Sequence, residues 1–180
     1  AGTIAVTVDG TVVSMVTKTA IDGGYKCTCT SPTLKDGSHT ISVKASDNDG
    51  NAAAAKTATF TVDTVPPTLQ ITAPSNGLIT NKKMVTVSGK TDDVSSKPVT
   101  VTVNGATVTV GTDGTFTKDV TLAEGANTIT IVAKDKAGKT TTVTRKVTVD
   151  TSAPVIKSVT LTPNPVDCGK TFIIAVEITD

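Results

Sequence analysis

The stretch Val99-Thr-Val-Thr-Val-Asn-Gly-Ala-Thr-Val-Thr-Val110 decides the fold of this chain. Valine and threonine alternate on both sides of Asn104-Gly105, so each half presents one apolar and one polar face, as a half-buried strand does. Asn-Gly readily adopts positive φ at both central positions of a two-residue turn, which suits the twist of paired strands. The stretch therefore predicts a β-hairpin of Val99–Val103 with Ala106–Val110.

The same alternation extends on both sides of this hairpin, and turn residues interrupt it at intervals of about 8–12 residues. No window shows a convincing 3.6-residue period. Thr and Val, which suit pleated strands, dominate the sequence. The pattern predicts an all-β sandwich with further strands at Leu69–Thr72, Met84–Gly89, Thr115–Leu122, Asn127–Lys134 and Thr140–Val149.

The chain repeats itself with a period of about 90 residues, which is the size of one small β-domain. The run Val6-Thr-Val-Asp-Gly10 returns as Val101-Thr-Val-Asn-Gly105. Two further pairs are Gly37-Ser-His-Thr-Ile41 with Gly125-Ala-Asn-Thr-Ile129, and Phe60-Thr-Val-Asp-Thr-Val-Pro-Pro67 with Val147-Thr-Val-Asp-Thr-Ser-Ala-Pro154. The repeats predict a tandem of modules rather than one large domain.

Domain boundaries are predicted where each repeat ends in Val-Asp-Thr and the next begins with proline, at Asp63–Pro67 and Asp150–Pro154. Proline fixes φ and lacks an N–H, so it stiffens a short joint and begins an edge strand. We therefore expect three units: residues 1–64, an incomplete domain without its first strand pair; residues 65–152, a complete domain; and residues 153–180, a strand pair of a third domain.

Composition narrows the functional classes. The chain has 17 Lys and Arg residues and 16 Asp and Glu residues, so it lacks the excess of positive charge that binding to nucleic acid requires. No apolar run approaches the ~20 residues of a membrane span, and no basic and apolar leader opens the chain. Aromatic residues make up 2% of the chain, so there are few rings on which a sugar could stack.

The second repeat resembles a bacterial immunoglobulin-like (Big-type) domain through the runs DTVPPTLQITAPSNG, VTVNG, DGTF, LAEGANTITIVAKDKAG and VTVDTSAP. Such domains occur in tandem on secreted enzymes, surface adhesins and phage tail proteins. The resemblance implies immunoglobulin-like sandwiches in an extracellular location, on a bacterial cell surface or a phage virion. It brings no catalytic or binding residues, because the family shares a fold and turn chemistry rather than a site.

The favoured function is a non-enzymatic structural or adhesive module, a spacer or stalk in a bacterial surface or phage tail assembly. The alternative is an accessory module, with carbohydrate binding as one role, of a secreted glycan-active enzyme. Glycan-binding modules usually display exposed rings, and Tyr25 is expected to be buried in the place of Phe116. The expected partners are other protein domains, a cell-surface or glycan ligand, or a second copy of the chain.

Self-association is suggested by the two ends. Residues 1–64 lack a counterpart of about Thr68–Pro98, whereas Val155–Leu161 and Thr171–Ile178 read as such a strand pair. One interpretation is a cut between modules or a different partner at the N-terminus. The other is head-to-tail exchange, in which the tail of one copy completes the open sandwich of the next.

Few residues suit catalysis or metal binding. His39, the only histidine, aligns with Asn127 and is expected to be a polar hairpin residue. The three cysteines are expected to be unpaired. Asp47-Asn-Asp49-Gly-Asn51 resembles the start of a calcium loop, but it lacks the distal bidentate Glu, and a plain hairpin turn is the favoured interpretation. The metal version would use Asp47 and Asp49, with Asp63 at the joint, to bind Ca²⁺; Asp92-Asp93 is expected to be a solvated loop.

Overall fold

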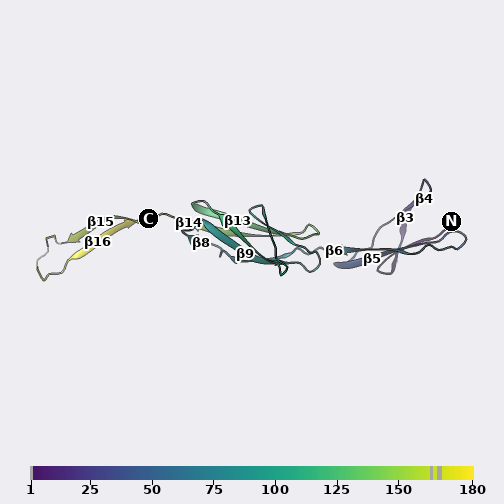
Figure 1. The fold of residues 1–180 in the computed structure, drawn as a ribbon, viewed down its shortest axis with the longest axis horizontal. Coiled ribbons are helices and arrows are strands. Elements are labelled where there is room, and N and C mark those ends of the chain that lie inside the picture. Colours follow the sequence, from purple (N-terminus) through teal and green to yellow (C-terminus); the bar gives the residue numbers. More distant parts are fainter. Residues whose placement is uncertain (1, 163, 166–167) are drawn as a thin grey trace.

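The computed structural model describes residues 2–162, 164–165 and 168–180, and over these residues it consists of strands and connecting turns without a helix. The prediction of an all-β chain is confirmed. Three groups of strands follow one another along the long axis of the molecule, in chain order (Figure 1). No helix among the described residues has the length and apolar character that a membrane crossing requires.

The central unit is a sandwich of two sheets. One has the order β11-β10-β13-β14-β8 and the other the order β12-β9-β7. All neighbours are antiparallel except β14 and β8, which are parallel. The strands are β7 Thr68–Ala73, β8 Leu78–Thr80, β9 Met84–Asp92, β10 Thr100–Val103, β11 Ala106–Val108, β12 Thr115–Thr121, β13 Gly125–Lys134 and β14 Thr140–Val149.

These strands agree with the predicted ones, with β8 added. The hairpin turn of β10 and β11 has φ of 48° at Asn104 and 81° at Gly105, as the Asn-Gly signal requires. Because β8 has only three residues, its alternation is too short to recognise in the sequence.

The core lies between these two sheets. Alternate residues point inward along β13, so Ile129, Ile131 and Ala133 are fully buried. Val87 and Val101 meet them from the two sheets, at 0% exposure. Burying a side chain of this size contributes roughly 1.5–3 kcal/mol, so this cluster is the main source of stability in the central unit.

Gly89 lets the two outer strands of the smaller sheet approach β9. It faces Phe116 across the β9–β12 pair, and Phe116 is 3% exposed. A Cβ at residue 89 would lie 2.4 Å from the carbonyl oxygen of Gln70 and 2.8 Å from Cζ of Phe116. The glycine therefore leaves the space that the aromatic ring fills.

The N-terminal unit has a different organisation. It consists of a four-stranded sheet, β2-β1-β5-β6, and a separate hairpin of β3 and β4. Val8 is the only apolar side chain buried within the described part of residues 2–64. The strands are β1 Ile4–Val8, β2 Thr11–Val13, β3 Met15–Ile21, β4 Gly24–Cys29, β5 Gly37–Ala45 and β6 Lys56–Val62.

The β3–β4 hairpin corrects the expectation for Tyr25. In the central unit, β12 carries Phe116 into the core because β12 pairs with β9. Tyr25 lies on β4, which pairs only with β3 in the described structure, and its side chain is 61% exposed. The ammonium of Lys18 lies 4.2 Å from the centre of its ring. Tyr25 is therefore a surface residue, not a counterpart of the buried Phe116.

The two units also differ by a two-residue shift in strand register. In the N-terminal unit the amide of Asp9 donates to the carbonyl of Thr40, and in the central unit Asn104 donates in the same way to Thr130. Measured from these bonds, the following turn begins two residues later in the N-terminal unit, at Asp47, than in the central unit, at Asp135. A shift by two keeps each side chain on its face.

The last described strands, β15 Val155–Thr162 and β16 Ile173–Thr179, pair only with each other. Apolar side chains on both strands are exposed, for example Ile156 at 63%, Val159 at 60% and Ile173 at 69%. This antiparallel pair agrees with the predicted strands. Its use in exchange between copies stays a prediction.

Candidate functional site

The first joint, residues 63–67, is fastened by a carboxylate of the N-terminal unit. The amide and hydroxyl of Thr64 both donate to Asp36, at 3.0 and 2.8 Å. The second joint, residues 150–154, repeats the arrangement: the amide and hydroxyl of Thr151 each donate to Glu124 at 2.8 Å. The repeated Val-Asp-Thr run therefore encodes a clamp that holds the start of each joint to the preceding sheet.

The clamp also affects the acid that accepts these bonds. The amide and then the hydroxyl of Thr151 stabilise the ionised Glu124, and they lower the pKa of its carboxyl below the usual value. The second joint is thus held by a charged acceptor, and such bonds are stronger than neutral ones.

Three carboxylates meet at the first joint: Asp63 from the N-terminal unit, and Asp93 and Asp135 from the central unit. One oxygen of each lies within 4.8 Å of those of the other two. Asp63 follows β6, Asp93 follows β9, and Asp135 opens the turn between β13 and β14. Asp93 is 6% exposed and Asp135 is 5% exposed. The joint thus brings together residues that are up to 72 positions apart, from Asp63 to Asp135.

Each of these carboxylates is oriented by backbone amides through its Oδ1 atom. Oδ1 of Asp93 accepts from Ser95 and Ser96, at 2.8 and 2.7 Å. Oδ1 of Asp135 accepts from Lys139 at 2.8 Å, and Oδ1 of Asp63 accepts from Val65 at 3.2 Å. The second oxygens, Oδ2, are therefore free to face the cluster.

The cluster has no cationic side chain to neutralise it. Over the described residues, no lysine or arginine nitrogen lies within 4.0 Å of these carboxylates. Lys97, which is close in sequence to Asp93, pairs instead with Asp92 at 2.8 Å. Two like charges about 4 Å apart repel by about 4 kcal/mol at an effective dielectric constant of 20. The arrangement is costly unless a positive charge joins it.

A cavity of about 420 Å³ adjoins the cluster and is lined by both units. Thr59, Phe60 and Asp63 belong to the N-terminal unit, whereas Ser95, Ser96, Lys97, Lys136 and Ala137 belong to the central unit. The hydroxyl of Ser96 accepts a bond from the amide of Ala137 at 2.9 Å, which ties the loop after β9 to the turn after β13. The cavity therefore lies beside the acidic cluster, at the boundary between the two units.

The structure divides the predicted metal-binding set. Asp63 lies at the joint, but Asp47 and Asp49 lie in the turn at the opposite end of the β5–β6 pair. Oδ1 of Asp47 accepts from the amides of Asp49 and Asn51, and its Oδ2 accepts from the Asn51 side chain at 2.7 Å. These bonds lower the pKa of Asp47, the Asn51 side chain contributing most. Both oxygens of the Asp47 carboxylate therefore accept hydrogen bonds from within the turn itself.

The expectation of a solvated loop at Asp92-Asp93 is wrong for Asp93, which is buried because the two serine amides draw its side chain inward. Sequence reasoning also missed Asp135 as a site residue. Its repeat counterpart is Asp47, and only the packing of one unit on the next distinguishes the two. The signal was the shared Val-Asp-Thr run, which placed Asp63 at the joint.

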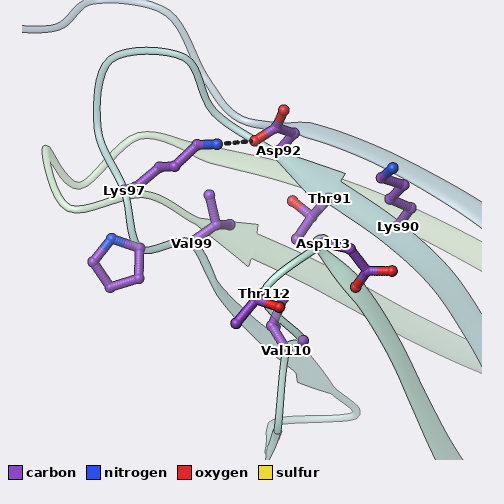
Figure 2. A pocket seen from close by; sticks show the side chains of 11 residues that line it. Lys90, Thr91, Asp92, Lys97, Val99, Val110, Thr112 and Asp113 are labelled. Atoms are coloured by element: carbon purple, nitrogen blue, oxygen red, sulfur yellow. Dashed lines mark ion pairs between the residues drawn. The ribbon is translucent and has the colours of Figure 1, made fainter.

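A second cavity of about 490 Å³ lies beside the end of β9 (Figure 2). Its acids are Asp92, which pairs with Lys97, and Asp113, whose Oδ1 accepts from the hydroxyl of Thr115 at 2.7 Å. The Lys97 ammonium lowers the pKa of Asp92, and the Thr115 hydroxyl lowers that of Asp113. A general acid needs a raised pKa, so these carboxylates suit turn structure rather than proton transfer.

The imidazole of His39 is buried, and each of its two ring nitrogens forms a hydrogen bond. Its Nδ1 lies 2.6 Å from Oδ2 of Asp9, and its Nε2 lies 2.7 Å from the carbonyl oxygen of Lys35. Both partners are acceptors, so the ring must be protonated to donate to both, and they raise its pKa above 6.5. In the pairing with the preceding strand, β1 or β10, His39 occupies the position of Ile129, whereas in the pairing with the following strand, β6 or β14, it occupies that of Asn127, as expected. It is therefore a structural imidazolium.

The cysteines are free, as expected: Cys27 and Cys29 are half-buried on β4, and Cys168 is exposed.

These features define a class of protein made of tandem all-β modules. The same threonine-to-carboxylate bonds occur at both joints, and the acidic cluster lies between two modules rather than within one. Residues 1–64 match the family model of the bacterial Ig-like domain, and residues 67–151 match that of domain B of glucodextranase. The match over residues 1–64 confirms the resemblance to bacterial immunoglobulin-like domains that was drawn from the sequence.

Among curated proteins, the chain is similar to bacillopeptidase F of Bacillus subtilis (strain 168), with 34% identity over 140 residues. The match covers 78% of this chain and 9% of that protein. Among solved structures, fibronectin(III)-like modules of CbhA from Clostridium thermocellum share 19% identity, over 82% of this chain and 77% of theirs, with a TM-score of 0.45. A tetra-tandem repeat from the extending region of a large adhesion protein shares 22% identity with this chain, with a TM-score of 0.42. The match covers 97% of this chain and 54% of that one.

Proposed function

We propose that this chain is a non-enzymatic spacer of an extracellular bacterial protein, which holds other parts of that protein apart. The observation that carries the proposal is the joint. The same threonine-to-carboxylate clamp occurs at Thr64 with Asp36 and at Thr151 with Glu124. A clamp repeated at each joint restricts bending, and a spacer needs that property more than it needs a pocket.

The chemistry of the described residues supports the same proposal. The carboxylates beside the larger cavity have lowered pKa values, and the only histidine is held between two acceptors inside its own unit. A nucleophile would need a base within hydrogen-bond reach and a base with a pKa near neutrality. The larger assembly is then a bacterial surface protein or a phage tail, and the neighbouring genes would distinguish these two settings.

Small-angle X-ray scattering tests the spacer proposal on the chain of residues 1–180. We expect an extended particle, and a shorter and broader distribution of distances when Thr64 and Thr151 are both replaced by valine. Valine keeps the shape of threonine but removes the hydroxyl donor, which costs about 1 kcal/mol at each joint. The matched control replaces Thr128 and Thr144 by valine as well; both lie in the β13–β14 pair, away from the joints. An unchanged distribution in the joint variant would contradict the proposal.

A second function is favoured by two observations. The central unit matches domain B of glucodextranase, and Tyr25 presents an exposed ring beside Lys18. An accessory module that binds glycans would use such a ring as a stacking surface. Affinity electrophoresis in gels containing α-glucans would show retardation of the unmodified chain and loss of that retardation in Tyr25→Ala. Equal migration of both proteins in all gels would exclude this function.

A further inference from the structure

We infer that Asp63, Asp93 and Asp135 form a binding site for one divalent cation, with Ca²⁺ as the ion that suits it, between the first two units. This inference does not depend on the spacer role, because it concerns binding at named residues. The three carboxylates converge within 4.8 Å, and two units contribute to them.

The independent evidence for a ligand is the state of the second carboxylate oxygens. Oδ2 of Asp63 and Oδ2 of Asp135 are buried and have no hydrogen-bond partner among the described residues. Asp135 is 5% exposed, so its side chain is more than nine-tenths buried. Buried acceptors without a partner are rare in folded proteins because water can no longer solvate them. A bound cation supplies the missing partner to both oxygens.

The donor set points to a hard cation. It contains carboxylate oxygen only, and Ca²⁺ binds six to eight oxygens at about 2.3–2.6 Å. Two oxygens on opposite sides of such an ion lie about 4.6–5.2 Å apart, which accommodates a cluster whose oxygens lie within 4.8 Å. The adjoining cavity of about 420 Å³ leaves space for water molecules as the remaining ligands. Zinc would prefer nitrogen or sulfur donors.

The carboxylates are already oriented for this role. Backbone amides hold each Oδ1, through Val65 for Asp63, Ser95 and Ser96 for Asp93, and Lys139 for Asp135. The side chains therefore lose little freedom when an ion binds to Oδ2. Because Asp63 immediately precedes the clamped Thr64, the ion would link the end of the N-terminal unit directly to two loops of the central unit.

The repeat provides a matched control. Asp47 shares one side-chain bond with Asp135, because the amide four residues later donates to Oδ1 in both, although Asp47 also accepts from the Asp49 amide and the Asn51 side chain. Asp47, however, has no cluster of acids around it over the described residues. Replacing each aspartate by asparagine keeps the Oδ1 acceptor and removes the charge, so Asp47→Asn makes the same chemical change in a turn that lies outside the site.

Isothermal titration of chelator-treated residues 1–180 with CaCl₂ tests the inference. We expect one site, at least tenfold weaker binding in Asp135→Asn, and unchanged binding in Asp47→Asn. MgCl₂ should bind more weakly, since Mg²⁺ demands a near-ideal octahedron that three fixed carboxylates do not provide. No binding by the unmodified chain, equal binding by Asp135→Asn, or a preference for Mg²⁺ would overturn the assignment.

Thermal unfolding separates a ligand from a merely structural aspartate. In chelator, Asp135→Asn should unfold at a higher temperature than the unmodified chain, because one of three mutually repelling charges is gone. In CaCl₂ the order should reverse, since only the unmodified chain gains from binding. A lower unfolding temperature of the variant in both buffers would overturn the inference. If circular dichroism shows that Asp135→Asn does not fold, Asp63→Asn, on the other unit, is subjected to the same two measurements.

Discussion

The N-terminal and central units share a sequence pattern but not a packing arrangement. The central unit closes two sheets over a core in which Ile129 and Ile131 are fully buried. The N-terminal unit has the counterparts of β10, β11, β13 and β14, but its described residues provide no second sheet to cover them. The same strands therefore give a closed sandwich in one case and a half-covered sheet in the other.

The difference shows that the alternating pattern specifies the strands and their faces, whereas burial depends on a partner sheet. Ile41 of β5 faces the same way as Ile131 of β13 in the shared register, yet only Ile131 is buried. Two residues before Ile41, His39 stands where the central unit has Ile129, when the position is counted from the pairing with β1 or β10. The N-terminal unit thus replaces an apolar core contact by a charged hydrogen-bonded one, and this contrast can be tested.

The largest expected effect concerns the two cores. Ile131→Ala should lower the free energy of unfolding of the central unit by about 2–5 kcal/mol, because it removes a fully buried side chain and leaves a cavity. The corresponding change in the half-covered sheet, Ile41→Ala, should cost about 1 kcal/mol, since less area is lost to water. Urea unfolding followed by far-UV circular dichroism measures both.

Ile79→Ala serves as the control for this pair, because Ile79 is an isoleucine of the central unit that is 73% exposed. It should change the free energy of unfolding by no more than about 0.5 kcal/mol. Equal losses for Ile41→Ala and Ile131→Ala would mean that the N-terminal sheet is covered in solution, and would remove the contrast between the units.

A smaller effect is expected from pH, and only in the N-terminal unit. Asp9 and the Lys35 carbonyl raise the pKa of His39 above 6.5, so the stability that its protonation contributes is complete below pH 6.5. It is lost as the pH rises through the raised pKa. The His39 ring and the Thr40 amide lower the pKa of Asp9 below 3.8, and that contribution disappears as the pH falls through the lowered pKa.

The N-terminal unit should therefore be most stable between about pH 3.8 and pH 6.5 and weaken toward pH 8. Thermal unfolding at pH 5.5, 6.5, 7.5 and 8 measures this change, and His39→Gln should abolish its alkaline part. Because the chain has one histidine, no other histidine titrates in this range. The transition of the central unit, which contains no histidine, should not respond. A flat profile for the unmodified N-terminal unit would show that the ion pair does not contribute.

Much of this fold was predictable from sequence because period-2 alternation and turn chemistry are local. The Asn104-Gly105 hairpin, the strands of the central unit and the pair β15–β16 all follow from neighbouring residues. Properties that depend on distant residues were not predictable. Tyr25 was expected to be buried because its sequence context matches that of Phe116, but its strand lacks the partner β9. His39 aligns with Asn127 in the pairing with the following strand, but only the pairing with β1, shifted by two residues, brings it to Asp9 at a position where the central unit has Ile129.

The candidate site was predictable in part for the same reason. The repeated Val-Asp-Thr run marks Asp63 as a joint residue, but nothing near Asp93 or Asp135 in the sequence distinguishes a buried acid from a turn acid. Asp47 and Asp135 even share their backbone bonds. Only the placement of one unit against the next brings the three acids within 4.8 Å.

The smallest expected effect is self-association through the uncovered surfaces at the two ends of the chain. The strands β15 and β16 correspond to β7 and β9, the pair that helps to close the central sandwich and that residues 2–64 lack as far as the structure describes them. Ile156 and Ile173 are more than 60% exposed. A second copy can cover them by strand addition to its open sheet. Light scattering at increasing concentration should then show a rising mean mass, which Ile156→Lys with Ile173→Lys should reduce, whereas Ile79→Lys on the closed unit should not. A constant monomer mass at millimolar concentration would argue against exchange and leave the difference between the units as a matter of folding alone.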